Sequence, residues 1–144
     1  MVDFHQAGWR PLVDQAKSRG IAFDARLPMN LRCRADRDVA QMIVVALLSN
    51  AAEHTNDGGR IEISGRNSAG FIELTVANTG CSLGEEDAQH VFDRFWRGDR
   101  PRTHTGIHCG LGLALVQRSA TALGGSVSAR IADEMFTVRL ILPA

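Results

Sequence analysis

The sequence predicts a single α/β domain in which helices and strands mix without strict βαβ alternation. Segments with apolar residues at helical spacing are interspersed with short runs in which every second residue is apolar. The length of 144 residues is enough for one domain with a real hydrophobic core. The sequence contains no repeat, low-complexity tract or linker, so we expect residues 1–144 to form one domain.

The first half of the chain is expected to contain two helices and four strands. Apolar spacing predicts a helix over residues 8–19, followed by two short strands in the segments GIAFDARL and NLRCRA. Asp36 is a good N-cap for a longer helix over residues 37–54. The segments RIEISGR and FIELTVA predict a β-hairpin that turns within residues 67–70.

The second half is expected to contain two more helices and a second strand pair. Apolar spacing predicts helices in EEDAQHVFDRFW, residues 85–96, and in LGLALVQRSATAL, residues 111–123. The segments SVSARI and FTVRLIL predict two strands around a turn at Asp133 and Glu134. Residues 96–109 are too long for an ordinary connection, which favours a functional lid.

Charge and cysteine content exclude several classes of protein. Sixteen basic residues balance sixteen acidic residues, so no overall field attracts nucleic acid or an anionic membrane. No apolar run has the length of a membrane span, and the N-terminus lacks the pattern of a signal peptide. Three widely spaced cysteines fit reduced thiols. We therefore expect a cytoplasmic domain that contacts neither nucleic acid nor the membrane.

Two polar sites follow apolar segments in the first half. Asn50 falls on the apolar stripe of the helix over residues 37–54, seven residues after Ile43, and His54 lies one turn further on. A buried amide needs a partner, which is either a neighbouring group or a ligand. Asn78 and Gly80 end an apolar strand, where glycine lets a ligand approach the backbone. A simple turn explains this second site equally well.

Two further sites flank the expected lid. The lid carries three arginines, which either form a solvated surface or close on phosphates: Arg97, Arg100 and Arg102. Gly110 and Gly112 begin a helix whose first backbone N–H groups attract anions. The spacing is neither that of a P-loop nor that of a dinucleotide-binding fingerprint.

The order of these four sites resembles a known family. The segments LLSNAAEHT, NTG, FDRFWRGD and GLGLALV resemble, in sequence, the N, G1, F and G2 boxes of the GHKL ATPases. They are most similar to the catalytic ATP-binding domain of sensor histidine kinases, and within it to heavy-metal-sensor kinases. The resemblance implies a two-layer α/β sandwich, with a mixed sheet of about five strands and three main helices on one face. It also implies ATP and Mg²⁺ as cofactors.

The resemblance assigns roles to several residues. Asn50 matches the Mg²⁺ ligand, and we expect His54 to belong to the same cofactor-binding patch. Asn78 matches the acceptor for the adenine amino group, Gly80 lets the base approach, and Leu83 packs on the ring. The phosphates are expected to contact the backbone N–H groups of Gly110, Leu111 and Gly112. They are also expected to contact the lid arginines Arg97, Arg100 and Arg102. The catalytic residues are expected to be Asn50 and Arg97.

An asparagine at position 78 raises a question of base selectivity. Most relatives carry an aspartate there, which can only accept hydrogen bonds, whereas an amide can also flip and donate to guanine. The sequence alone therefore predicts poorer discrimination between ATP and GTP. It also predicts that Asn78→Asp tightens ATP binding about fivefold, through a charge-assisted hydrogen bond.

The resemblance implies that this domain acts with others. Its partners are a dimerisation and histidine phosphotransfer domain of the same kinase and, through it, a response regulator. We expect the chain to be the ATP-binding domain of a longer, membrane-bound sensor. His5 imitates a phosphoacceptor histidine, but Gln6 replaces the usual acid. Alternatives are an anti-sigma-factor-type serine kinase or a degenerate module that signals by contact, since Ala46, Glu53 and Ser82 depart from the family pattern.

Overall fold

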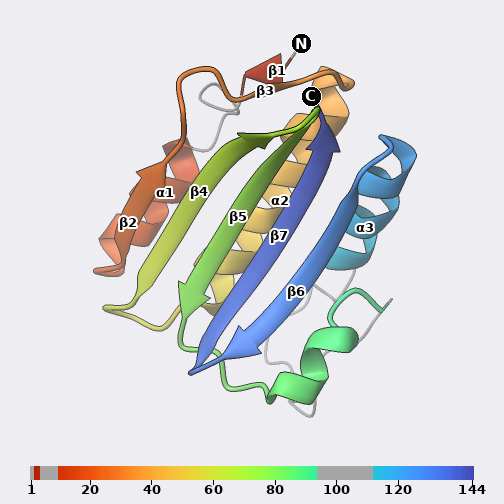
Figure 1. Cartoon of the computed structure of the whole chain (residues 1–144). Coiled ribbons are helices and arrows are strands. Elements are labelled where there is room, and N and C mark those ends of the chain that lie inside the picture. The colour runs from red at the N-terminus through yellow and green to blue at the C-terminus, as the bar shows by residue number, and fades with distance from the viewer. Residues whose placement is uncertain (1, 4–9, 94–111) are drawn as a thin grey trace.

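The computed structural model describes residues 2–3, 10–93 and 112–144 of the chain. Its main feature is a five-stranded sheet in the order β2-β4-β5-β7-β6 (Figure 1). Strand β2 runs parallel to β4, and the other neighbours are antiparallel, so the predicted mixed sheet is confirmed. The strands are β2 (Ala22–Arg26), β4 (Arg60–Ser68), β5 (Phe71–Thr79), β6 (Ser126–Ala132) and β7 (Met135–Pro143).

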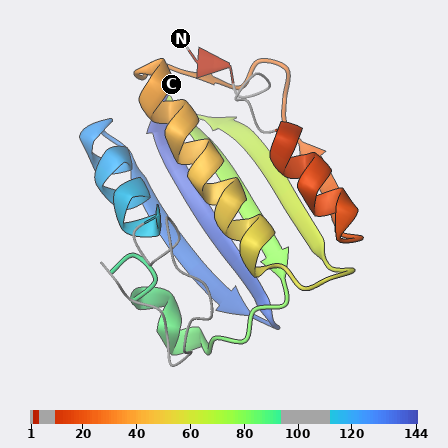
Figure 2. The ribbon, with the colours of Figure 1, turned by 180° about the vertical axis from the view of Figure 1, so that it is seen from behind.

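Three α-helices cover one face of this sheet, as the resemblance implied (Figure 2). They are α1 (Arg10–Ser18), α2 (Arg37–His54) and α3 (Gly112–Ala122). Helix α2 has the predicted bounds because Asp36 caps it: Asp36 Oδ1 accepts the N–H groups of Asp38 and Val39, at 2.9 and 3.1 Å. Within the described residues, no helix combines the length and the apolar character needed to cross a membrane.

The core lies between the helices and the sheet. Alternate residues of the two central strands, such as Ile72 and Leu74 in β5 and Leu140 and Leu142 in β7, are fully buried. Their neighbours along each strand point to the opposite face, because side chains alternate across a sheet. The helices therefore bury one face of each strand, and the other face is left open.

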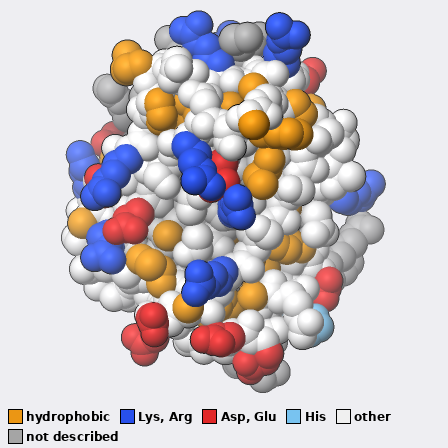
Figure 3. Space-filling view, viewed as in Figure 1, with side chains coloured by type: hydrophobic (Ala, Val, Ile, Leu, Met, Phe, Trp, Pro, Cys, Tyr) orange, Lys and Arg blue, Asp and Glu red, His pale blue; other side chains and the backbone are white. Residues whose placement is uncertain are grey.

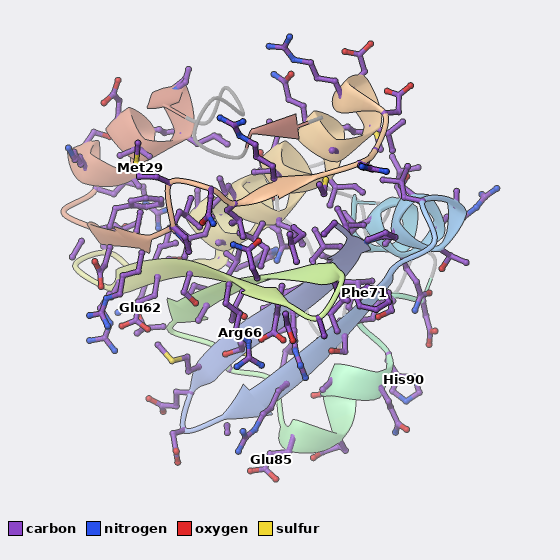
Figure 4. The ribbon with its side chains drawn as sticks, turned by 45° about the horizontal axis from the view of Figure 1, so that its top comes forward. Met29, Glu62, Arg66, Phe71, Glu85 and His90 are labelled. Atoms are coloured by element: carbon purple, nitrogen blue, oxygen red, sulfur yellow. The ribbon has the colours of Figure 1, made fainter. Side chains whose placement is uncertain are left out.

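Charged side chains occupy the open face, on which basic and acidic groups are interspersed (Figure 3). Glu62 and Arg66 project from it, away from the helices (Figure 4). Glu73 accepts hydrogen bonds from Arg139 at 2.6 Å and from Arg66 at 3.0 Å. These two guanidinium groups, Arg139 first, hold the pKa of the Glu73 carboxyl below its ordinary value.

Two sequence predictions in the first half need correction. The strand expected in NLRCRA is only β3 (Arg32–Cys33), and it does not join the large sheet. It pairs antiparallel with β1 (Val2–Asp3), a strand that was not predicted. Such a pairing joins segments about thirty residues apart, which local periodicity does not reveal. The hairpin is confirmed, but β4 and β5 extend further than expected and leave only Ala69 and Gly70 in the turn.

The α-helix predicted over residues 85–96 is also wrong in its described part. Residues Glu85–Gln89 form a 3₁₀ helix, η2, and the chain continues in i→i+3 turns through Asp93. Residues 94–96 lie outside the described part. Val91 is nevertheless buried, and Ala88 and Phe92 pack against the core. The apolar face was thus predicted correctly in the described residues, but apolar spacing did not distinguish a 3₁₀ helix from an α-helix. In the structure η2 packs beside β6.

Candidate functional site

Three elements bring the predicted site residues to one end of the molecule. The C-terminal ends of α2 and β5 and the N-terminal end of α3 lie at the same end of the sheet, as two opposite views agree (Figures 1 and 2). The site residues on these elements are more than sixty positions apart along the chain, from Asn50 to Gly112. The antiparallel ladder between β4 and β5 and the return of α3 beside α2 produce this gathering.

Asn50 and His54 both lie in the last part of α2. Asn50 is half-buried and His54 is exposed. The fully buried face of the helix runs through Ala40, Ile43, Val44, Leu47, Leu48, Ala51 and Ala52. Asn50 therefore flanks this face and does not project into the core, which corrects the sequence-based expectation of a core-facing position. At this margin its amide needs no buried protein partner and is accessible to a ligand.

Arg19, which follows α1, holds the C-terminal end of α2. Its guanidinium donates to the carbonyl oxygens of Ala52 and Thr55, and its Nε lies 2.8 Å from Asp57 Oδ1. The Ala52 carbonyl belongs to the last turn of α2 and the Thr55 carbonyl to its C-cap residue, where intrahelical donors run out. A cation also favours the negative end of the helix dipole. Arg19 was not predicted from sequence, because nothing local links it to residues more than thirty positions away.

Asn78 lies near the end of β5, on the face that the helices cover. Its residue is 2% exposed, and it pairs with Ile61 of β4 and Phe136 of β7. Its Nδ2 donates to the backbone carbonyl of Thr79 at 3.1 Å. Gly80 follows with a φ of +84°, a conformation that favours glycine. Leu83, three residues later, is partly buried against the core.

A set of four residues, here called the Asn56 cluster, supports this strand end: Asn56, Gly59, Thr79 and Gly80. Asn56 Oδ1 accepts the Thr79 hydroxyl at 2.8 Å, and Thr79 Oγ1 accepts the N–H of Arg60 at 2.9 Å. A Cβ on Gly59 or Gly80 would come within 2.3 or 2.6 Å of Asn56 Oδ1. Sequence reasoning missed Asn56, whose only local signal is a turn-forming Asn-Asp-Gly-Gly segment.

The remaining predicted residues belong to the lid and to the start of α3. Gly112 is the first residue of α3. Gly110, Leu111, Arg97, Arg100 and Arg102 lie outside the described residues. No group of three or more His, Cys, Asp or Glu side chains in the described part of the chain could hold a metal ion. The amide oxygen of Asn50, in the last part of α2, is a hard and neutral donor of the kind that suits Mg²⁺.

The fold defines a class of protein, the ATPases built on an α/β sandwich with a mixed five-stranded sheet. Residues 35–144 match the family described as Histidine kinase-, DNA gyrase B-, and HSP90-like ATPase, and the chain belongs to this family. Members of the family bind nucleotide. Within it, the chain is homologous to the catalytic ATP-binding domain of sensor histidine kinases.

Individual relatives agree with this assignment. The sensor-like histidine kinase SenX3 of Mycobacterium tuberculosis is 35% identical over 100 residues, which cover 69% of this chain and 24% of SenX3. The probable sensor kinase SilS of Salmonella typhimurium is 36% identical over 96 residues, or 67% of this chain and 19% of SilS. The chain thus spans about a quarter or less of the length of these relatives.

Solved structures show the same fold. The mycobacterial sensor histidine kinase MprB superposes with a TM-score of 0.83 at 25% identity, covering 98% of this chain and 95% of that chain. Histidine kinase ThkA, in a complex with the response regulator protein TrrA, superposes with a TM-score of 0.79 at 20% identity, covering 97% of this chain and 39% of that chain.

Proposed function

We propose that the chain binds Mg·ATP and transfers the γ-phosphate to a histidine on a separate dimerisation domain, as the catalytic domain of a two-component sensor histidine kinase. The observation that carries the proposal is that the C-terminal ends of α2 and β5, which carry Asn50 and Asn78, lie at the same end of the sheet as the start of α3 (Figures 1 and 2). Residues 1–144 form one domain in this proposal. Its catalysis consists of positioning ATP and neutralising its charge, without a covalent intermediate on this chain.

The adenine ring is proposed to bind at the end of β5. Asn78 accepts a hydrogen bond from the amino group of the base, and Gly80 keeps the backbone open for its approach. Leu83 contacts the ring. Support comes from the buried position of Asn78 and the positive φ of Gly80.

The triphosphate is proposed to bind between α2 and α3. Asn50 is one oxygen ligand of Mg²⁺, which keeps its other contacts to phosphates and water, and His54 lies beside it. The first N–H groups of α3 lack intrahelical partners, so they and the adjoining loop suit phosphate oxygens. The proposed phosphate contacts are Gly110, Leu111, Gly112, Arg97, Arg100 and Arg102.

The proposed partners are the dimerisation and histidine phosphotransfer domain of the same kinase and, through it, a response regulator. The complex of the related ThkA with TrrA supports this kind of partner. We also propose that the domain works at the cytoplasmic end of a membrane-bound sensor, without touching the membrane itself. The finer resemblance to heavy-metal-sensor kinases stays a prediction.

A second candidate is a degenerate domain that signals by contact. The observation that favours it is Glu53, an acid three residues after the proposed metal ligand. Glu53 is half-buried, and its Oε2 is shielded from solvent. Ser82, in place of a glycine, is a further departure from the family pattern. An anti-sigma-factor-type serine kinase would have the same nucleotide site. It differs from a histidine kinase in the residue that accepts the phosphate, which is a serine.

Calorimetric titration with ATP, in Mg²⁺ and in EDTA, tests the proposal. Binding that strengthens with Mg²⁺ is expected, because the cation bridges Asn50 and the phosphates. Absence of binding at millimolar ATP would support the degenerate domain. A histidine acceptor is then distinguished from a serine acceptor by supplying the chain with a dimerisation hairpin and γ-labelled ATP. A label that acid removes indicates phosphohistidine, and a label that survives acid indicates phosphoserine.

A further inference from the structure

Strand β6 is an edge of the five-stranded sheet, and β7 is its one neighbour among the described strands. The turn over residues 133–134 that joins them has positive φ at both positions. In a hairpin with such a turn, the flanking pair, here Ala132 and Met135, exchanges both backbone hydrogen bonds, and this pattern recurs at every second residue. The intervening residues therefore direct their backbone N–H and C=O groups away from β7: Val127, Ala129 and Ile131.

These outward backbone groups form an open edge. In the described part of the chain, no segment outside the hairpin hydrogen-bonds to the three residues. Proteins commonly protect such an edge with lysine, proline or a bulge. The β6 sequence, SVSARIA, contains neither lysine nor proline, and it pairs with β7 residue for residue. The edge can therefore accept a further strand.

A groove of about 500 Å³ lies beside this edge, between η2 and β6. Its apolar lining consists of Ala88 and Phe92 on one side and Val127 and Ala129 on the other, and all four are half-buried. Val127 and Ala129 pack against the core, so they lie on the covered face of the sheet. A strand added to β6 would direct every second side chain to this same face. Apolar side chains of that strand would enter the groove.

The groove has an acidic rim. Glu85 and Glu86 of η2 line it, and both are exposed. Figure 3 shows acidic side chains gathered at the lower end of the molecule, where η2 and the β6–β7 turn lie in Figure 1, and Glu85 projects outward in Figure 4. The one basic residue of β6 is Arg130. The charge at this edge therefore favours a basic partner and repels nucleic acid or an acidic peptide.

We propose that the free edge of β6 and the adjoining groove form a docking site for an extended, basic segment of a partner protein. The segment adds to the sheet as a strand that pairs with Val127, Ala129 and Ile131. Its apolar side chains fill the groove, and lysine or arginine residues that flank them pair with Glu85 and Glu86. A second copy of this chain fits less well, because it would bring its own η2 carboxylates to the same edge.

The probe for this site is a seven-residue peptide, Lys-Thr-Val-Thr-Val-Thr-Lys, with both ends blocked. In a strand its valines and lysines share one face. Titration into the ¹⁵N-labelled chain is expected to shift the amide resonances of Val127, Ala129 and Ile131. The matched peptide with glutamate in place of both lysines is expected to bind at least tenfold more weakly, because like charges then meet at the rim.

Two variants separate the edge from the rim. Ala129→Pro removes an N–H that points to the free edge and takes no bond from the β6–β7 ladder, so it is expected to weaken peptide binding about tenfold. Glu85→Lys changes an exposed side chain and is expected to weaken binding about fivefold. Asp14→Lys makes the same change in charge at an exposed position of α1 and should leave binding unchanged. Thermal unfolding of each variant checks that it is folded.

The outcomes distinguish this site from the nucleotide site. Absence of β6 amide shifts at millimolar peptide, or equal binding of the two peptides, overturns the proposal. A dimer in sedimentation that Ala129→Pro disperses, with no peptide binding, also overturns it, since the occupant is then a second copy. None of these residues belongs to the proposed nucleotide site, so Glu85→Lys should leave ATP affinity unchanged. Peptide binding by a chain that fails to bind ATP would support the docking site and contradict only the proposed function.

Discussion

The degree of burial of a side chain decides whether it can bind a ligand and whether it can carry a charge. Asn50 is half-buried at the margin of a helix, Asn78 is buried beside a carbonyl, and Cys33 is fully buried in an apolar core. A polar group at the margin remains available to a ligand, whereas a buried group must be satisfied or stay neutral.

Asn50→Ala is expected to leave folding nearly intact and to remove the Mg²⁺ dependence of ATP affinity. Alanine is the best helix former, and a half-buried amide leaves no large cavity. Calorimetry with ATP in Mg²⁺ and in EDTA measures the effect. Gln41→Ala is the matched control, because Gln41 is a half-buried amide earlier on the same helix. Persistence of the Mg²⁺ dependence in Asn50→Ala would rule out Asn50 as the ligand.

Cys33 is expected to make the fold less stable in alkali. Burial raises the pKa of its thiol from 9.0 to about 11. Above pH 9 the unfolded chain releases this proton first, so the stability due to Cys33 declines as the pH rises from about 9 toward 11. Urea unfolding of the wild type and of Cys33→Ala over this range measures it. The difference between the two unfolding free energies should shrink with pH, and a constant difference would contradict the prediction.

Whole elements are positioned mainly by how their ends are held. Helix α2 is capped by Asp36 at one end and by Arg19 at the other, so its length and direction are set at both termini. The C-terminal end of α2, which carries Asn50 and His54, lies at the same end of the sheet as the C-terminal end of β5. The β6–β7 hairpin ends in a two-residue turn, in which Asp133 and Glu134 have φ values of +54° and +62°. Turns with positive φ at both positions favour Asn-Gly or Asp-Gly.

Glu134→Gly is expected to stabilise the protein by about 1 kcal/mol, because a side chain at positive φ carries a steric cost of that order. The thermal midpoint should rise by about 2–4 °C. The backbone carbonyl that accepts Cys81 N–H is unaffected by the change. Glu134→Ala keeps a Cβ at the same φ and should give no gain. Equal midpoints for the two variants would show that the turn is unstrained.

At the scale of the molecule, the sheet separates a covered face from an open one and gathers the candidate site at one end (Figures 2 and 3). The proposed site holds and presents a nucleotide, while the acceptor histidine is expected on another domain. Transfer then depends on the effective concentration that a covalent link between the two domains supplies.

The isolated chain is accordingly expected to bind ATP without labelling itself, and to phosphorylate a supplied dimerisation hairpin only slowly. Incubation with γ-labelled ATP, with and without the hairpin, measures both rates. Adding a wild-type full-length relative of known activity provides the positive control. An acid-labile label on His5 of the isolated chain would show that the chain carries its own acceptor.

Local sequence patterns were sufficient to predict most of the helices and strands of this protein. Asp36 and the apolar spacing after it predicted α2 with its observed bounds, and alternating residues predicted β4, β5, β6 and β7. These features depend on hydrogen bonds and side-chain periodicity within a few residues, so they can be read along the chain. The order of the four polar segments also predicted the family, because each box keeps its place in the sequence.

Contacts between residues far apart in the sequence determined the features that local patterns did not predict. The pairing of β3 with β1, the 3₁₀ geometry of η2 and the marginal position of Asn50 all depend on what packs against them. The Thr79 hydroxyl donates to Asn56 Oδ1 across 23 residues of chain, and the Thr79 carbonyl accepts from Asn78 Nδ2. No periodicity records such a meeting, because it arises only when α2, β4 and β5 have packed. The sequence could suggest Asn78 as a residue for base binding, but the hydrogen bond from its amide to Thr79 O exists only in the folded strand end.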